Sequence, residues 1–119
     1  MTILLVDDDA MVRLAASHAL SAAGHTVLEA DSGDAALALA HGVSLDVLLL
    51  DVLLDDEDGA QLAATLRSLP GNARTPIVFL TGRADAERDR LLALGAAGVL
   101  AKPFDISTLA ARLEELVCP

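Results

Sequence analysis

The sequence predicts a doubly wound α/β fold, in which a five-stranded parallel sheet carries helices on both faces. Short apolar runs alternate five times with Ala- and Leu-rich segments of helical spacing, and such alternation is typical of successive β–α units. The apolar runs are continuous, as in strands that are buried on both faces. With 119 residues, 54% of them apolar, the chain is long enough to form a core. We therefore expect a single domain over residues 1–119.

The strands are predicted from apolar runs that end at polar or turn-forming residues. The first run, from Ile3 to Val6, leads directly into three aspartates. The third begins at Asp46 and is apolar from there on, and the fourth begins at Pro76. The predicted strands cover residues 3–6, 26–30, 46–50, 76–80 and 98–101.

The helices are predicted from apolar stripes bounded by capping residues. Ser32 is a suitable N-cap for the second helix, and Asp105 or Ser107 for the last. Gly24 and Gly95 follow the first and fourth helices, where glycine commonly forms the C-terminal cap. The predicted helices cover residues 9–23, 33–40, 59–69, 84–94 and 106–117.

Composition excludes several classes of function. The formal net charge of −10 argues against nucleic-acid binding, which needs a basic face. The single cysteine, Cys118, excludes an internal disulfide and a cysteine-based zinc site. No secretory signal is visible, and the longest uncharged apolar run, residues 91–101, is shorter than the ~20 residues that span a bilayer. We expect a soluble cytoplasmic protein that binds neither nucleic acid nor membrane.

Polar side chains follow four of the five predicted strands. Asp7 and Asp8 follow the first strand, Asp51 the third and Thr81 the fourth, while Lys102, the one lysine in the chain, follows the fifth. In a sheet of strand order 2-1-3-4-5, the carboxyl ends of these strands meet at one edge, beside the point where the strand order reverses. We therefore expect these five side chains to converge.

The residue types at this edge indicate phosphoryl chemistry. Three neighbouring carboxylates repel one another unless a cation compensates them, and Mg²⁺ binds such oxygens while bridging to phosphate. Lys102 supplies a point charge for a phosphoryl oxygen, and Thr81 a hydroxyl donor. The set predicts a carboxylate that accepts a phosphoryl group, with Mg²⁺ and Lys102 neutralising the other oxygens.

Four short motifs, in this order and at this spacing, carry a resemblance to a known family. They are Val-Asp-Asp at 6–8, Asp51 followed by Asp58-Gly59, Leu-Thr-Gly at 80–82, and Lys-Pro-Phe at 102–104. Over residues 3–116 the chain resembles the receiver domain of bacterial two-component response regulators, in particular those like the chemotaxis regulators. The resemblance implies a flavodoxin-like receiver fold and a function in a phosphorelay.

The resemblance also implies a role for each residue of the acidic edge. Asp51 corresponds to the phosphoacceptor. Asp8 corresponds to a direct Mg²⁺ ligand, and Asp7 to a residue that acts through metal-bound water. The backbone carbonyl of Leu53 corresponds to the remaining protein ligand.

Further roles concern the switch and the partners. Thr81 and Gly82 would border the phosphoryl group, with Thr81 moving toward it, and Lys102 would bind a phosphoryl oxygen next to a cis bond to Pro103. The donor would be the phosphohistidine of a sensor histidine kinase or a histidine phosphotransfer protein. The output would pass to an effector protein through the face of the fourth helix and fifth strand. The receiver would catalyse its own transfer and slow self-dephosphorylation without being a turnover enzyme, and a weak homodimer is left open.

Three positions depart from the family pattern. Val99 stands where the family usually has an aromatic residue that moves with the threonine. Asp55 stands where a proline is common and begins an acidic run through Glu57. Gly82 replaces a frequent alanine, which leaves the phosphoryl site more open.

Two other functions stay open on the residues alone. A degenerate receiver that serves only as a docking module is compatible with Val99. A small aspartyl-phosphate phosphatase would use the same nucleophile, but such enzymes usually carry a second carboxylate at the position that Leu53 occupies. The start at Met1 favours a stand-alone receiver over a domain cut from a longer chain.

Overall fold

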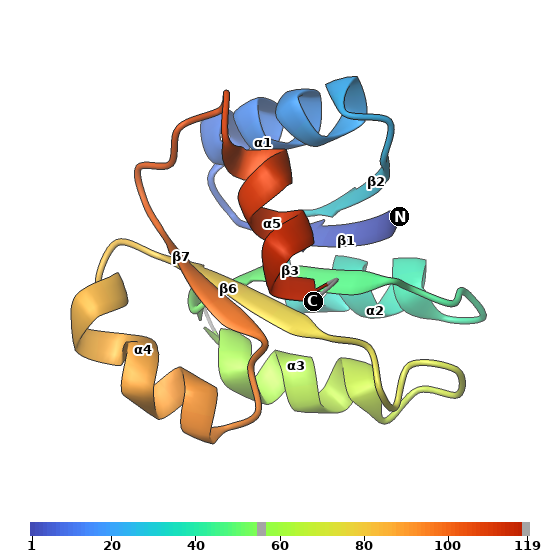
Figure 1. The fold of residues 1–119 in the computed structure, drawn as a ribbon. Helices are drawn as coiled ribbons and strands as arrows, with labels where there is room; N and C mark the ends of the chain where they lie inside the picture. The colour runs from blue at the N-terminus through green and yellow to red at the C-terminus, as the bar shows by residue number, and fades with distance from the viewer. Residues whose placement is uncertain (55–56, 118–119) are drawn as a thin grey trace.

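The computed structural model describes residues 1–54 and 57–117 and contains the expected five-stranded parallel sheet. The strand order is β2-β1-β3-β6-β7, which is the predicted 2-1-3-4-5 order when the strands of this sheet alone are counted (Figure 1). The predicted fold class is therefore confirmed. The strands are β1 (Thr2–Val6), β2 (Thr26–Ala30), β3 (Val47–Asp51), β6 (Ile77–Thr81) and β7 (Gly98–Ala101).

Helices cover both faces of this sheet. One apolar cluster packs α1 and α5 against one face, and a second packs α2, α3 and α4 against the other (Figure 1). No helix in the described part of the chain is long and apolar enough to cross a membrane. The helices are α1 (Ala10–Ala22), α2 (Gly33–Ala40), α3 (Gly59–Arg67), α4 (Ala84–Ala93) and α5 (Leu109–Val117).

The central strand β3 shows why its sequence is continuously apolar. Leu48 and Leu50 belong to the cluster under α2, α3 and α4, while Val47 and Leu49 belong to the cluster under α1 and α5. All four are fully buried, and each buried leucine contributes about 1.5–3 kcal/mol of transfer free energy. The burial of both faces fixes β3, and with it Asp51 at its end.

Two of the sheet strands run one residue further than predicted. The parallel ladder includes Asp51, which pairs with Leu80, and Thr81, which pairs with Ala101. The backbones of both polar residues are thus held by the sheet rather than by a loop. This rigid placement suits side chains that must keep a fixed geometry.

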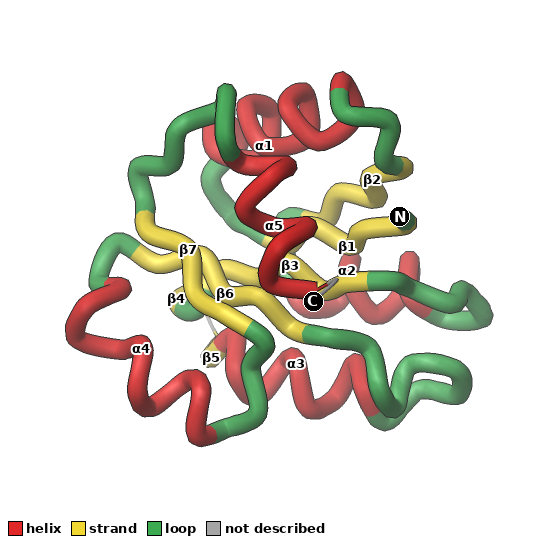
Figure 2. Tube along the Cα trace, in the orientation of Figure 1, coloured by secondary structure: helices red, strands yellow, loops and turns green. Residues whose placement is uncertain are grey.

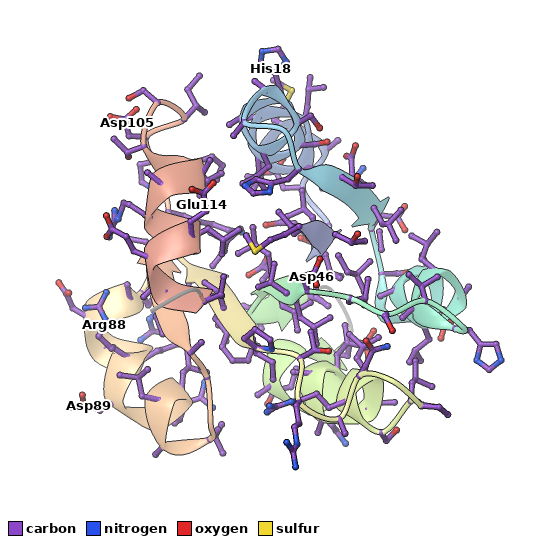
Figure 3. The ribbon with its side chains drawn as sticks, turned by 45° about the vertical axis from the view of Figure 1, so that its right-hand side comes forward. His18, Asp46, Arg88, Asp89, Asp105 and Glu114 are labelled. Carbon is purple, nitrogen blue, oxygen red and sulfur yellow. The ribbon has the colours of Figure 1, made fainter. Side chains whose placement is uncertain are left out.

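The expected start of the last helix at residue 106 is wrong, because α5 begins at Leu109. The Asp105 carboxylate accepts hydrogen bonds from the backbone N–H and the hydroxyl of Ser107, at 2.9 and 2.7 Å. The backbone N–H of Thr108 donates to the Asp105 carbonyl at 3.1 Å. These contacts form a turn in front of the helix (Figure 3), so Asp105 stabilises a turn instead of capping α5.

The acidic segment after β3 contains two very short strands that the sequence did not predict. These are β4 (Leu53–Leu54) and β5 (Glu57–Asp58), which pair antiparallel, apart from the main sheet (Figure 2). Asp55 and Asp56, the first part of the acidic run, lie outside the described residues. The strand pair leads directly into α3, whose first turn is capped by the Asp58 carboxylate.

Candidate functional site

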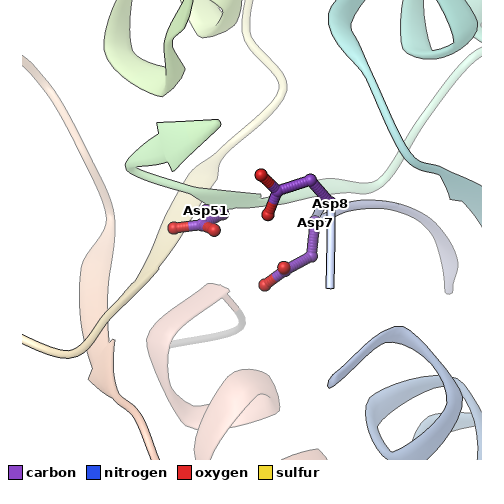
Figure 4. A group of neighbouring side chains, drawn as sticks. All are labelled: Asp7, Asp8 and Asp51. Atoms are coloured by element: carbon purple, nitrogen blue, oxygen red, sulfur yellow. The ribbon is translucent and has the colours of Figure 1, made fainter. Parts of the chain in front are cut away.

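The structure brings the three predicted aspartates together at the carboxyl edge of the sheet. Asp7 and Asp8 follow β1, and Asp51 ends the adjacent strand β3. Each offers a carboxylate oxygen within 4.8 Å of the others (Figure 4). The cluster follows from the pairing of Val6 with Leu50, which sets the two strand ends side by side.

Lys102 joins this cluster from β7, two strands away from β3. Its Nζ lies 2.6 Å from Asp7 Oδ2 and 3.1 Å from Asp51 Oδ2. The Asp7 side chain is fully buried and the Lys102 side chain is 20% exposed. A buried carboxylate is costly without a partner of opposite charge, so Lys102 compensates both Asp7 and Asp51.

The pKa values of Asp51 and Lys102 are both raised, for different reasons. Burial raises the pKa of Asp51, the hydrogen bond from the Leu53 N–H lowers it, and the charge of Asp7 raises it further; the net result lies above the ordinary value in spite of Lys102. Burial lowers the pKa of Lys102, but its contacts with Asp7 and Asp51 more than offset this, so the pKa is raised. The ionised Asp51 carboxylate is therefore short of positive charge even with Lys102 beside it.

Thr81 and Gly82 complete the predicted edge. Thr81 is buried at the end of β6, and its Oγ1 accepts a hydrogen bond from the Arg83 N–H at 3.0 Å. The Lys102 N–H donates to the Thr81 carbonyl at 2.9 Å, so the two residues are linked through the backbone. A Cβ added at Gly82 would meet no atom within 4 Å, which leaves the space beside Thr81 open.

Position 59 requires glycine because it packs closely against the end of β3. A Cβ at Gly59 would lie 2.1 Å from the Asp51 carbonyl oxygen, a backbone atom that cannot move aside. The Gly59 N–H donates to the Val52 carbonyl at 2.7 Å. The start of α3 thus packs directly on the end of β3, and any larger residue at 59 would displace the Asp51 backbone.

An open cleft of about 740 Å³ lies over Asp51 and Thr81. Arg83, which precedes α4, and Glu87 and Arg90 within α4 also line it. Glu87 and Arg90 were not predicted as site residues, because they belong to no motif and lie within the predicted helix 84–94. The cleft gives Asp51 access to a reactant, while Lys102 stays in contact with the Asp51 carboxylate.

Arg13 is a third residue near the site that the sequence did not predict. Its Nη1 donates to the Asp7 carbonyl oxygen at 2.7 Å, and the Asp9 N–H donates to the Asp7 carboxylate at 2.9 Å. These bonds hold the turn between β1 and α1. No sequence motif signals the Arg13 contact, because it depends on how α1 leaves that turn.

Leu53, Pro103 and Val99 are the remaining positions that the sequence analysis named. The Leu53 N–H donates to Asp51 Oδ1 at 3.1 Å, and the Leu53 side chain is 77% exposed at the cleft. The peptide bond between Lys102 and Pro103 is cis. Val99 is buried in the core beneath α4, and its carbonyl accepts a bond from Arg88 Nη2 at 3.4 Å.

The donor set of the acidic cluster fits a hard divalent cation. Asp7, Asp8 and Asp51 offer carboxylate oxygens, which are the ligands that Mg²⁺ and Ca²⁺ prefer. The raised pKa of Asp51 indicates that further positive charge would stabilise its ionised form. The residues at this edge are therefore suited to hold Mg²⁺.

Comparison with known families decides the family of this chain. Residues 3–114 match the response regulator receiver domain family, and the match includes every residue of the site described above. The chain belongs to the response regulator receiver family. It is similar to the transcriptional regulatory protein CpxR of Klebsiella pneumoniae, with 40% identity over 117 residues that cover 97% of the chain and 48% of CpxR.

Other relatives agree with this membership. The transcriptional regulatory protein TrcR of Mycobacterium tuberculosis is 38% identical over 97% of this receiver and 44% of its own length. The receiver thus spans about half the length of the curated relatives it matches.

Solved structures show the same fold. The chemotaxis protein CheY4 of Vibrio cholerae has a TM-score of 0.88 and 34% identity, over 97% of both chains. The receiver domain of the sensor histidine kinase PA1611 of Pseudomonas aeruginosa has a TM-score of 0.84 and 28% identity, over 99% and 98% of the two chains. That structure has a magnesium ion coordinated in its active site cleft.

The raised pKa of Asp51 predicts that Asp51→Asn stabilises the metal-free receiver. A carboxyl whose pKa is raised by folding stabilises the fold most below its unfolded pKa of about 4, and the benefit is lost as pH rises through the folded pKa. Because asparagine does not ionise, the Asp51→Asn variant does not lose stability in this way as the pH rises. Its melting temperature in a chelating buffer at neutral pH is expected to exceed that of the wild type.

Thermal melts followed by circular dichroism between pH 4 and 8 test this prediction. The difference in melting temperature between Asp51→Asn and the wild type should widen as the pH rises. Asp89→Asn, which removes a charge from the outer side of α4 (Figure 3), should show no such widening. A lower melting temperature for Asp51→Asn at neutral pH would contradict the charge balance described for the site.

Proposed function

We propose that this receiver accepts a phosphoryl group on Asp51 from the phosphohistidine of a sensor histidine kinase or a histidine phosphotransfer protein. The observation that carries the proposal is the contact of the Lys102 ammonium with both Asp51 and the buried Asp7, together with the open cleft that Asp51 lines. A carboxylate nucleophile, a cation beside it and access for a reactant are the parts that phosphoryl transfer needs.

The transfer forms one bond and breaks another. An Asp51 carboxylate oxygen forms the new O–P bond, the N–P bond of the phosphohistidine breaks, and its electron pair stays on the imidazole, which takes up a proton. Charge builds on the phosphoryl oxygens during this exchange. Lys102 binds one of these oxygens, and the Thr81 hydroxyl donates to another. Gly82 leaves room for the group, since no atom occupies the space where a Cβ would lie.

Asp7, Asp8 and Asp51 would hold Mg²⁺, together with the backbone carbonyl of Leu53. Asp8 would contact the ion directly, and the fully buried Asp7 would act through metal-bound water. When bound, Mg²⁺ supplies the positive charge that neutralises the phosphoryl oxygens. The magnesium ion in the PA1611 receiver supports this assignment.

Phosphorylation would act as a population shift toward a conformation that binds a different partner. The new charge would draw the Thr81 hydroxyl away from the Arg83 N–H, to which it is bonded here. That bond lies at the start of α4, so the change would reach the face of α4 and β7 where an effector binds. Val99 is small and already buried there, so the output would not require an aromatic residue to move inward.

The two other functions are less well supported. An aspartyl-phosphate phosphatase usually carries a second carboxylate two residues after its nucleophile, but the exposed side chain at that position is Leu53. A docking-only module would not need Lys102 to compensate the acceptor. We therefore propose a single receiver domain over residues 1–119 that transfers the phosphoryl group to itself and slowly loses it, and that is not a turnover enzyme.

Intact mass spectrometry after incubation with Mg²⁺ and acetyl phosphate tests the proposed function. The expected result is an increase by the mass of one phosphoryl group, absent when the metal is chelated. Binding of Mg²⁺ should be confirmed separately, by the rise in melting temperature that a ligand of the native state produces. Failure to gain mass with Mg²⁺ bound, both from acetyl phosphate and from phosphorylated histidine phosphotransfer proteins, would contradict the proposal.

A further inference from the structure

A second cavity lies on the α2–α3–α4 side of the sheet, between α3 and α4. It has a volume of about 660 Å³, and Figure 1 shows the two helices side by side on this face. Its floor is apolar, formed by the buried Ile77 and Phe79 of β6. Cavities of 300–1,000 Å³ with apolar walls and a few polar groups are typical of small-molecule sites.

The cavity exists because the residues around it are small. Alanines line both sides where α3 and the segment after α4 face each other, and Leu94 forms part of the rim with 58% of its surface exposed. Larger apolar side chains at these positions would fill the space. The alanines that line it are Ala60, Ala63, Ala64, Ala73 and Ala96.

Arg67 at the end of α3 gives the cavity a positive charge. Its Nε is buried and has no hydrogen-bond partner among the described residues, and no ion pair joins it to any of them. Its Nη1 extends across the cavity to within 3.9 Å of the position a Cβ would take at Gly95, in the turn after α4. The guanidinium charge of Arg67 is therefore not paired with a described carboxylate, and an anionic group in the cavity would compensate it.

Arg90 adds a second guanidinium to the same cavity. Its contact with Glu87 is long, at 3.8 Å, and half of its side chain is exposed. Two arginines that line one apolar cavity are unusual on a chain whose net charge is −10. Arg90 and Asp58 also line the cleft over Asp51, so the two cavities share a wall.

We propose that the groove between α3 and α4 binds a small molecule that has an apolar body and an anionic group. The apolar body packs between the alanines and Phe79, and the anion pairs with Arg67, with Arg90 beside it. This site is separate from the acceptor Asp51, and its occupation does not depend on phosphorylation. Because Arg90 belongs to both cavities, the ligand lies directly beside the cleft in which phosphoryl transfer is proposed.

The dye 8-anilinonaphthalene-1-sulfonate has this chemistry and serves as the probe. Fluorescence titration of the wild-type chain should show binding, and the dye should raise the melting temperature because it binds the native state. The Arg67→Gln variant should bind roughly tenfold more weakly, as expected for loss of one charge-assisted hydrogen bond. N-phenyl-1-naphthylamine, which has the same rings without the sulfonate, should also bind more weakly.

Two further variants keep the test decisive. Arg112→Gln removes an arginine from a different cavity, between α4 and α5, and should leave the affinity unchanged. Ala64→Leu keeps every charge and a helix-forming residue but fills the groove, so it should weaken binding even if Arg67→Gln fails to fold. The proposal is overturned if the dye does not bind, if it lowers the melting temperature, if Arg112→Gln weakens binding as much as Arg67→Gln, or if Ala64→Leu binds as the wild type does.

Discussion

Replacement of Asp51 by asparagine is expected to abolish phosphorylation of the chain. The amide of asparagine is a much weaker nucleophile than the carboxylate of aspartate. Asp7, the other carboxylate in contact with Lys102, is fully buried. Intact mass spectra taken with Mg²⁺ and acetyl phosphate should show no phosphoryl adduct for Asp51→Asn, under conditions that modify most of the wild type. The loss should be complete, because Asp51 is the carboxylate that both lines the open cleft and contacts Lys102.

The control for this experiment is Asp89→Asn, which removes a carboxylate from an exposed position on α4 (Figure 3) and should be modified as the wild type is. The thermal melt of Asp51→Asn, which is expected to show a higher melting temperature than the wild type, distinguishes loss of the acceptor from unfolding. An undiminished adduct in Asp51→Asn would place the acceptor elsewhere.

Replacement of Lys102 by methionine is expected to have two large effects. It leaves the fully buried Asp7 and the Asp51 carboxylate without their ammonium partner, and removing one member of a buried ion pair costs 3–5 kcal/mol. Since Lys102 is 20% exposed, we expect the lower end, about 3 kcal/mol of unfolding free energy in the absence of metal. Loss of the cation should also slow phosphorylation roughly 100-fold, as loss of one preorganised donor does in other enzymes.

Urea unfolding followed by circular dichroism measures the first effect, and the rate of adduct formation measures the second. Arg74→Met removes a positive charge from an exposed residue and should change neither quantity by more than a small fraction. Added Mg²⁺ should restore part of the stability of Lys102→Met, because it supplies positive charge to the same carboxylates. Wild-type stability of the metal-free variant would show that Lys102 does not compensate the cluster.

The fold could be predicted from the sequence because most strands are marked by continuous apolar runs. The run that forms β3 is apolar throughout since both of its faces are covered, and the polar residue after each run marks the carboxyl edge. This placed Asp7, Asp51 and Lys102 together before their distances were known. The contact between Lys102 and Asp7, at 2.6 Å, was not predictable, because it requires the lysine to extend past the ends of both β6 and β3.

Features that depend on single turns or on facing helices could not be predicted. Two-residue strands such as β4 and β5 are too short to show a periodic pattern. The start of α5 was misplaced because Asp105 has the same capping chemistry in a turn as at a helix terminus. The groove between α3 and α4 depends on alanines from segments distant in sequence, which read simply as helix-forming residues.

Chemical localisation of the phosphoryl group tests the central claim most directly. An acyl phosphate is reduced by borohydride to the alcohol, so a phosphorylated aspartate becomes homoserine, which peptide mass spectrometry can locate. The account predicts homoserine at position 51 in a sample phosphorylated with Mg²⁺, and none in a sample from which the metal was removed. Homoserine at position 7, 8 or 58, or a phosphorylated chain without any homoserine, would contradict the assignment of Asp51 as the acceptor.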